Sequence, residues 1–484
     1  MKTEYISKDS APFYKAATGN ERLLELLWGD RVVYDETQGV TNGRIKARAR
    51  GWNGFVNKSD LGPDSLLEIY FIDVGQGDGV LIRTPEDKHI MIDGGYKRAS
   101  QPTGKNAADF VDWKFVKDYG RTDIVLDAMI ASHNDADHYG GLWDLINPNE
   151  TRELDAQSVK VKKFYTAGVS WFKKAGARSL GDVATVGGIK YLTSLVNSRQ
   201  DVQSFLAPGA PMPFQGEWKE FMECVEAQNC VVERLSQKSK WLDGFGQNAP
   251  VRVKVLGPVE FSVNNKPALK SLGSDPSQNT NGHSVLLRLD YKRVRVLLTG
   301  DLNAKSQAVL LDEYTGNRQE FACDVVKACH HGSDDCSFEF LRTISAAATV
   351  ISSGDEEGHG HPRPSIVAAS ALTGFQNIDN DRVVTPLVYQ TEVARSYRLG
   401  KPTKISGPNN LSLTNMSELT AEYKETASGA LNPRTGTRPL SFSYLVTGVL
   451  YGLVNVRTDG DKILCATLNE ADRTWDIKTF RSRF

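Results

Sequence analysis

The chain lacks several features that would place it in a specialised class of protein. Its formal net charge is −1 over 484 residues, so no overall positive field attracts nucleic acid, and any such binding needs a local basic patch. No run approaches the roughly 18 apolar residues of a membrane helix, and the first residues contain no apolar signal-peptide core. The six cysteines form no Cys-x-x-Cys pair, which indicates reduced thiols in a cytoplasmic protein.

Histidine usage, in contrast, is concentrated. The chain has eight histidines, and seven of them fall in four short motifs, each close to an apolar run. Those seven are His133 and His138, then His283, then His330 and His331, and finally His359 and His361. Scattered core or surface histidines would not cluster in this way. The length allows about two or three domains of ~150 residues.

The stretch 132–141 is the densest of these motifs. Four metal-capable side chains lie there within six residues: His133, Asp135, Asp137 and His138. The apolar run 124–130 before them predicts a buried strand that aims these side chains off a sheet edge. Gly140 and Gly141 are expected to let the backbone turn into a helix that starts near residue 142. Imidazole and carboxylate together favour zinc or manganese.

Residues 1–63 read as a separate small β module. Their order of a Leu-Trp-Gly-Asp turn, an arginine-rich strand and a Gly-Trp-Asn-Gly-Phe-Val strand resembles the bacterial SH3-like domain. The strand 44–50 carries basic residues on one face, which could contact phosphates or be a solvated face. The module could also bind a protein partner.

A glycine-rich turn, 75–79, joins two strands of the next segment, and a third strand ends in Asp93-Gly94-Gly95. No Gly-Lys-Ser/Thr follows, so the turn is not a P-loop. We expect the glycines to let the backbone pass close to the metal-bearing loop. Asp78 and Asp93 would then support that loop by hydrogen bonds.

The later motifs share one arrangement, a buried strand with a polar tip. The tips carry His283, Asp301, His330-His331-Gly332-Ser333 and His359-Gly360-His361. Active sites borne by sheets are assembled in this way from distant parts of a sequence. Between the first and later motifs, residues 189–196 are expected to be helical. Residues 171–178 mix cations with aromatics, as an amphipathic surface helix or a stacking surface for a single strand would.

Taken together, the motifs 73–78, 92–95 and 132–141 resemble the metallo-β-lactamase superfamily, most closely the branch of the DNA-uptake protein ComEC. That branch carries Asp where most of the superfamily has a second His, and Asp135 shows the same substitution. The resemblance covers about residues 66–480. It implies an α+β protein with an αββα sandwich over 66–484, preceded by the SH3-like β-barrel and interrupted by an insertion around 145–250.

The resemblance also implies two divalent metal ions, zinc or manganese. It places His133 and Asp135 on the first ion, Asp137 and His138 on the second, and Asp301 between both. His361 would complete the second ion. His283 stands where many members have a ligand of the first ion, although the ComEC-like pattern has Asn there.

The roles of the remaining residues follow from the chemistry of such ions. Water between two divalent ions loses a proton near neutral pH and becomes a hydroxide nucleophile. Asp137 would hold it, and His331 would stabilise the charge of the transition state. His330 and Ser333 would contact the phosphate.

The carboxylate-rich set and the family branch predict a phosphodiesterase that cleaves DNA. Two alternatives stay open. One is a small-molecule hydrolase acting on a cyclic nucleotide, phosphoester or acyl ester. The other is a metal-binding subunit of a multi-protein system.

Overall fold

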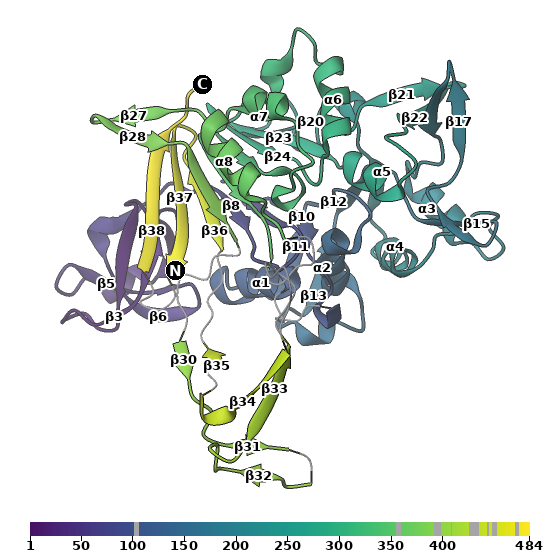
Figure 1. Cartoon of the computed structure of the whole chain (residues 1–484). Helices are drawn as coiled ribbons and strands as arrows, with labels where there is room; N and C mark the ends of the chain where they lie inside the picture. Colours follow the sequence, from purple (N-terminus) through teal and green to yellow (C-terminus); the bar gives the residue numbers. More distant parts are fainter. Residues whose placement is uncertain are drawn as a thin grey trace.

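Two large β-sheets packed face to face form the centre of the molecule, with helices on both outer sides (Figure 1). The computed structural model describes residues 1–100, 106–354, 360–391, 398–407, 409–424, 435–442, 445–447, 453–469 and 474–484. This layering is the predicted αββα sandwich of an α+β protein.

The first large sheet has nine strands in the order β19-β14-β12-β10-β9-β8-β36-β37-β38. In chain order these are β8 (Leu67–Phe71), β9 (Gly79–Arg83), β10 (His89–Gly94), β12 (Ala128–Ala131), β14 (Lys163–Thr166), β19 (Val231–Arg234), β36 (Val454–Thr458), β37 (Lys462–Asn469) and β38 (Thr474–Arg481). The segment 145–250, which we expected to be an insertion, therefore contributes β14 and β19 to the sheet.

The second large sheet has six strands in the order β20-β23-β24-β25-β26-β29. They are β20 (Val251–Gly257), β23 (Leu286–Tyr291), β24 (Val294–Leu298), β25 (Val325–Lys327), β26 (Ala348–Ile351) and β29 (Leu387–Gln390). The strands β24, β25, β26 and β29 run parallel, as do β10, β12, β14 and β19 in the first sheet. Parallel strands end at one common edge, so the loops that follow them meet there.

Alternation along the strands explains the layers. In β8, Ile69 and Phe71 pack into the core between the two sheets, whereas Tyr70 points to the helical side. The first sheet is covered by α1 (Ala107–Trp113), α2 (Ala136–Ile146) and α4 (Glu217–Ala227), and the second by α6 (Ala304–Glu313) and α7 (Phe338–Ile344). The remaining helices are α3 (Arg199–Leu206), α5 (Pro276–Gly282) and α8 (Pro364–Thr373). No described helix is long and apolar enough to cross a membrane.

The N-terminal residues form their own seven-stranded sheet, in the order β3-β2-β6-β5-β4-β1-β7. Its strands are β1 (Lys2–Ile6), β2 (Ser10–Tyr14), β3 (Arg22–Leu27), β4 (Arg31–Tyr34), β5 (Arg44–Ala49), β6 (Trp52–Asn57) and β7 (Leu61–Gly62). The sheet encloses a separate apolar cluster. The SH3-like identity of this module stays a prediction.

The N-terminal module packs on the C-terminal strands of the first large sheet (Figure 1). Arg457 of β36 is fully buried and pairs with Asp30 of the module at 2.8 Å. Two of the basic residues that we considered for phosphate binding are engaged at this junction: Arg50 pairs with Asp30 at 2.8 Å, and Arg48 donates to the Lys117 carbonyl. Arg48 thus contacts a residue outside the module, and Arg50 does so through the ring of Trp475, whose centroid lies 4.8 Å from its guanidinium carbon.

Several smaller sheets accompany the two large ones. They consist of β11 (Asp123–Leu126) with β13 (Ser158–Val161), β15 (Phe172–Lys174) with β16 (Ala177–Ser179), a four-stranded sheet of β17 (Val183–Val186), β18 (Ile189–Leu192), β22 (Lys266–Lys270) and β21 (Glu260–Val263), and β27 (Asn377–Asp379) with β28 (Arg382–Thr385). Three further pairs project from the body: β30 (Arg398–Gly400) with β35 (Leu445–Thr447), β31 (Ile405–Ser406) with β32 (Ser412–Leu413), and β33 (Thr420–Lys424) with β34 (Thr435–Pro439) (Figure 1).

Two helix predictions were wrong. Residues 189–192 are strand β18, which pairs with β17 through a turn at Gly187 and Gly188, both with positive φ. The 171–178 stretch holds the β15–β16 hairpin, and Trp171 and Phe172 are 6% and 0% exposed. Their rings are therefore buried and offer no stacking surface for bases.

Candidate metal centre

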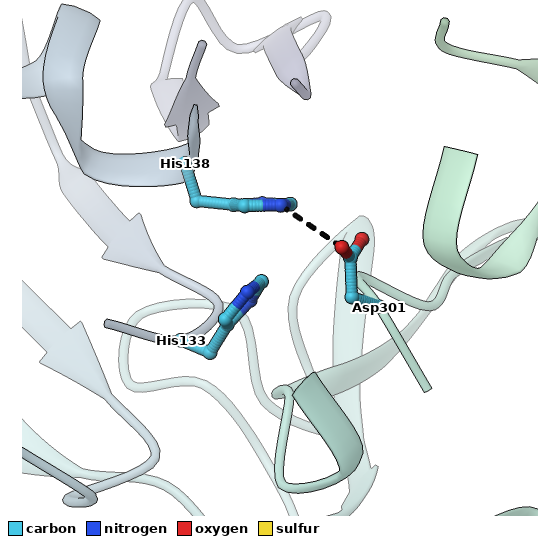
Figure 2. A group of neighbouring side chains, drawn as sticks. All are labelled: His133, His138 and Asp301. Atoms are coloured by element: carbon cyan, nitrogen blue, oxygen red, sulfur yellow. Dashed lines mark ion pairs between the residues drawn. The ribbon is translucent and has the colours of Figure 1, made fainter. Parts of the chain in front are cut away.

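The clustered histidines and carboxylates converge at the common edge of the two sheets. His133, Asp135, Asp137 and His138 follow β12, Asp301 follows β24, and His330 and His331 follow β25. Asp301 Oδ2 lies 3.2 Å from His138 Nε2 and 3.0 Å from His331 Nε2. Figure 2 shows His133 and His138 turned toward Asp301. Side chains separated by about 200 residues thus share one buried space.

Three of the imidazoles are oriented in the same way. Each has its Nδ1 engaged at the back: His138 with Asp93 Oδ2 at 2.9 Å, His331 with the Ser352 carbonyl at 3.1 Å, and His133 with the hydroxyls of Ser132 and Ser284 at 3.1 and 3.2 Å. The Nε2 atoms of all three are buried, and those of His138 and His331 face the carboxylate of Asp301. A second-sphere contact on one ring nitrogen leaves the other free to bind a metal.

The donor set therefore fits divalent metal. Three-residue groups whose ligand atoms all lie within 4.8 Å of one another include His133, His138 and Asp301, and also Asp137, His138 and His331. Two further groups combine Asp78 with Asp301 and His331, and Asp78 with Asp93 and His138. Nitrogen and oxygen donors without thiolates suit zinc or manganese.

His331 differs from its expected place. We expected it to contact substrate, yet its Nε2 lies 3.6 Å from Asp137 Oδ2, in position to be a ligand. His361 lies on the cavity wall, with its ring centroid 6.4 Å from that of His331. Its role as a ligand stays a prediction, and His359 lies outside the described residues.

The structure does not bring His283 into this cluster. Its Nε2 donates to the Lys270 carbonyl at 2.9 Å, and among the described residues it belongs to no metal-binding group. Burial lowers its pKa to about 4, which keeps the ring neutral. Two residues earlier, Asn281 occupies the site instead: with its amide nitrogen toward Asp135, it donates to Asp135 Oδ2 at 2.8 Å and accepts from His330 Nε2 at 3.2 Å. The ComEC-like pattern has Asn where we expected His283 to be a ligand. That difference was the signal in the sequence that could have identified Asn281.

The other predicted residues lie around the cluster. Asp135 is 3.7 Å from His133 Nε2 and accepts from Thr280 Oγ1 at 3.0 Å. His330 Nε2 lies 3.8 Å from Asp301, and the backbone of His330 is left-handed, with φ of 46°. Ser333 lines the cavity, and its Oγ accepts from the Asp335 amide at 3.3 Å.

Glycines bring the backbone segments close together, as expected for the turn 75–79. A Cβ on Gly77, whose φ is +111°, would lie 2.0 Å from the carbonyl oxygen of Asp137. The place of Gly141 in the structure differs from our expectation. It lies inside α2, which begins at Ala136 rather than near 142, and a Cβ there would meet the Gly94 carbonyl at 2.1 Å. Close packing of α2 on β10, not a turn, requires glycine at that position.

Lys327 is a charged residue at the site that we did not anticipate. It is 2% exposed, pairs with Asp78, and lies 3.6 Å from Asp301 Oδ1. Its only sequence signal is its place as a lysine at the end of the apolar run 321–327. It supplies a permanent positive charge beside the carboxylates.

Opposite charges attract one another across the cluster. Burial lowers the pKa of His138, but Asp301 and Asp93 outweigh it and hold that pKa well above its ordinary value. Burial and the neighbouring Asp137 raise the pKa of Asp135 to about 6. Protons and divalent ions therefore compete for the same lone pairs.

A cavity of about 590 Å³ opens over these residues. Asp135, Asp137, Asp301, His330, His331 and His361 form part of its wall. A substrate in it would lie directly against the candidate metal ligands.

Comparisons with known proteins found a family model and several similar proteins. A family model described as "Metallo-beta-lactamase superfamily" matches residues 72–210. The competence protein ComA of Neisseria gonorrhoeae is 24% identical over 334 residues, which are 68% of this chain and 33% of ComA. The chain thus spans about a third of the length of that curated relative.

Solved structures with similarity include the metallo-β-lactamase fold protein YhfI from Bacillus subtilis, at 10% identity and a TM-score of 0.31 over 67% of this chain and 97% of YhfI. Tm1679, a metal-dependent hydrolase of the β-lactamase superfamily, is 14% identical, with a TM-score of 0.31 over 67% of this chain and 96% of its own. The matched residues 72–210 include the glycine-rich turn, Asp93 and the His133–His138 motif. The family model thus supports the predicted metallo-β-lactamase domain over residues 72–210 of this chain.

Proposed function

We propose that this protein is a metal-dependent phosphodiesterase that cleaves DNA. The observation that carries the proposal is the cluster of three buried imidazoles, His133, His138 and His331, around Asp301, beside a 590 Å³ cavity whose wall includes His331, Asp137 and Asp301. We further propose two ions, of zinc or manganese, because more than one group of ligands shares His138 and Asp301. The DNA substrate is supported by the resemblance to the ComEC-like branch and by the similarity to a competence protein.

When bound, divalent ions lower the pKa of coordinated water to near neutrality and offset charge on a phosphoryl group. The chain's own residues supply the rest. Asp137 holds the attacking water and accepts its hydrogen bond. His330, on the cavity wall and 24% exposed at its side chain, is placed to contact the phosphate or protonate the leaving oxygen.

The support around the ligands keeps these atoms in place. Asp93, Ser284 and the Ser352 carbonyl fix the three imidazoles from behind. Ser284 also links His133 to Asp301, because its Oγ accepts a hydrogen bond from the Asp301 backbone amide at 2.9 Å. Ligands that are fixed before an ion arrives lose little freedom when they bind it.

The test is cleavage of labelled single- and double-stranded DNA with Mn²⁺, Zn²⁺ or a chelator, beside an Asp137→Ala control. We expect cleavage only with metal and its loss in the control. Metal content, measured by inductively coupled plasma mass spectrometry, should show about two ions per chain. Absence of cleavage with every metal would contradict the nuclease proposal. Unchanged cleavage by the Asp137→Ala control would contradict the assignment of the active site to this cluster.

The size of the cavity favours a second candidate, a small-molecule phosphoesterase, because about 590 Å³ is typical of pockets for small ligands. A panel of cyclic nucleotides, phosphoesters and acyl esters separates the two. A kcat/KM that is higher for any of these than for DNA would favour the small-molecule hydrolase. The cytoplasmic location and a protein partner for the N-terminal module stay predictions.

A further inference from the structure

Two arginines on the wall of the cavity have no part in the metal-dependent step. Arg178 lies in β16 and Arg363 directly precedes α8, so they come from separate parts of the fold. Both are exposed, and neither pairs with a carboxylate of the described residues. Lys97, which follows Tyr96 of the cavity wall, pairs instead with Glu217.

Arg178 is held in a defined place beside the first ligand loop. Its guanidinium carbon lies 3.7 Å from the ring centroid of Trp171. Trp171 is itself fixed, since it is 6% exposed and its Nε1 donates to the Asn134 carbonyl at 3.0 Å. Asn134 stands between His133 and Asp135. The stacked guanidinium therefore presents its N–H groups next to the candidate ligands without the disorder of a free surface arginine.

Arg363 is tied to the opposite set of ligands. Its backbone amide donates to the Gly332 carbonyl at 2.9 Å, and Gly332 follows His331. A Cβ on Gly332 would lie 2.7 Å from Pro362, so this segment packs tightly on the histidine loop. The charge of Arg363 thus borders the His330–His331 side of the cavity, while that of Arg178 borders the His133–Asp135 side.

We propose that Arg178 and Arg363 bind the phosphates on either side of the one being cleaved. The substrate is then a nucleic-acid strand that carries phosphates on both flanks, rather than an isolated phosphoester. This inference rests on the proposed function and names the substrate class of the same site.

The charges of the cavity explain why such contacts are needed. Asp135, Asp137 and Asp301 line its interior, and their charge opposes the approach of a polyanion. A planar guanidinium offers paired N–H donors that match two phosphate oxygens. One cation would be enough for a monoester or a cyclic nucleotide. Two cations, on the two sides of the ligand cluster, match a chain of phosphates that crosses it.

Binding is measured separately from cleavage. A fluorescent phosphorothioate 12-mer, which resists hydrolysis, is titrated by anisotropy with Mn²⁺-loaded protein. The variants are Arg178→Gln, Arg363→Gln and both together, with Arg178→Lys to keep the charge. Arg382→Gln is the matched control, because Arg382 is an exposed arginine of β28, away from the cavity wall.

We expect about tenfold weaker binding for each Gln variant and a near-normal affinity for Arg382→Gln. Arg178→Lys should show an intermediate loss, because lysine keeps the charge but neither the stacked plane nor the paired donors. The slope of log affinity against log salt should become shallower by about 0.7 for each lost phosphate contact with a single strand. A dinucleoside monophosphate and bis(4-nitrophenyl) phosphate have no flanking phosphate. The KM for these compounds should stay within about twofold of the wild-type value.

Two results would overturn the inference: unchanged affinity for the 12-mer in the double variant, or an equal loss for the 12-mer and for the single-phosphate compounds. Anisotropy decides this whether or not the protein cleaves DNA. A protein that binds the 12-mer through both arginines but cleaves nothing would contradict only the proposed function. A protein that cleaves DNA normally but binds the 12-mer equally well without the two arginines would contradict only this inference.

Discussion

The ammonium group of Lys327 lies 3.6 Å from Asp301 Oδ1 and forms an ion pair with Asp78, and all three side chains are buried. A buried lysine beside candidate metal ligands supplies one unit of the positive charge that these carboxylates need. The same carboxylates lie near His138 and His331. Their negative charge is therefore balanced by the lysine, the imidazoles and a bound ion together.

Replacement of this lysine should therefore make stability dependent on metal. In metal-free Lys327→Met, Asp78 and Asp301 lose their fixed countercharge, and we expect a loss of about 3–5 kcal/mol in the free energy of unfolding. Saturating Zn²⁺ or Mn²⁺ should raise Tm more in this variant than in the wild type, because the ion replaces the missing charge. Thermal unfolding with and without metal measures both effects.

Lys254→Met is the matched control for that variant. Lys254 pairs with Glu320 at 2.7 Å in a partly exposed position, so its loss should cost about 1 kcal/mol or less. Equal stability of Lys327→Met and wild type without metal would contradict the charge-balance role.

The place of His283 predicts a variant with unchanged metal content. Its Nε2 is engaged with the Lys270 carbonyl, and a glutamine can donate to the same oxygen. His283→Gln should retain the metal-to-protein ratio of the wild type in mass spectrometry, whereas His138→Gln should lose at least half of it. A drop in metal content of His283→Gln would restore His283 as a ligand.

A buried ion pair contributes to the attachment of the N-terminal module. Arg457 donates to the Trp28 carbonyl at 2.6 Å and pairs with Asp30 at 2.8 Å, both fully out of solvent. Arg457→Met leaves Asp30 with Arg50 as its remaining ion-pair partner, and we expect the free energy of unfolding to fall by about 3–5 kcal/mol. The double variant Asp30→Asn/Arg457→Met should recover part of this loss in chemical denaturation, and no recovery would contradict the pairing.

His89 predicts a pH dependence of stability. Burial lowers its pKa from 6.5 to about 3, although Asp87 acts in the opposite direction. Between these two values the unfolded chain binds a proton that the folded chain excludes, so stability falls as the pH is lowered from 6.5 toward 3. The contribution of His89 is about 1.4 kcal/mol per pH unit in that window.

The matched variant for this prediction is His89→Phe, because the ring of His89 packs on Phe115 and Tyr119, with centroids 4.6 and 5.6 Å apart. Phenylalanine keeps the apolar contacts and cannot be protonated. Urea unfolding at pH 6.5 and pH 5 should show a smaller difference for the variant than for the wild type. An identical pH dependence would show that His89 is not the responsible group.

Some features of this protein could be predicted from short stretches of sequence alone, because residues close together in the chain produce them. The apolar run before residues 132–141 predicts a strand, and the concentration of His and Asp after it predicts a metal-binding loop. The same applies to the tips at Asp301 and His331, which the structure brings to the edge where the strands end. The helix 189–196 was wrong because the pairing of β17 with β18 outweighs the local preference, and the Gly187-Gly188 turn was the missed signal.

Thus the sequence by itself determined the metallo-β-lactamase domain and the αββα class, and it predicted most of the candidate donor set, since these depend on residue types next to strands. Only the tertiary structure decided which atoms meet. It placed Asn281 rather than His283 at the site, set Lys327 between Asp78 and Asp301, and engaged Arg48 and Arg50 in holding the N-terminal module. The physical reason is that burial and ion pairing arise between segments far apart in the chain, and no local pattern encodes those distances.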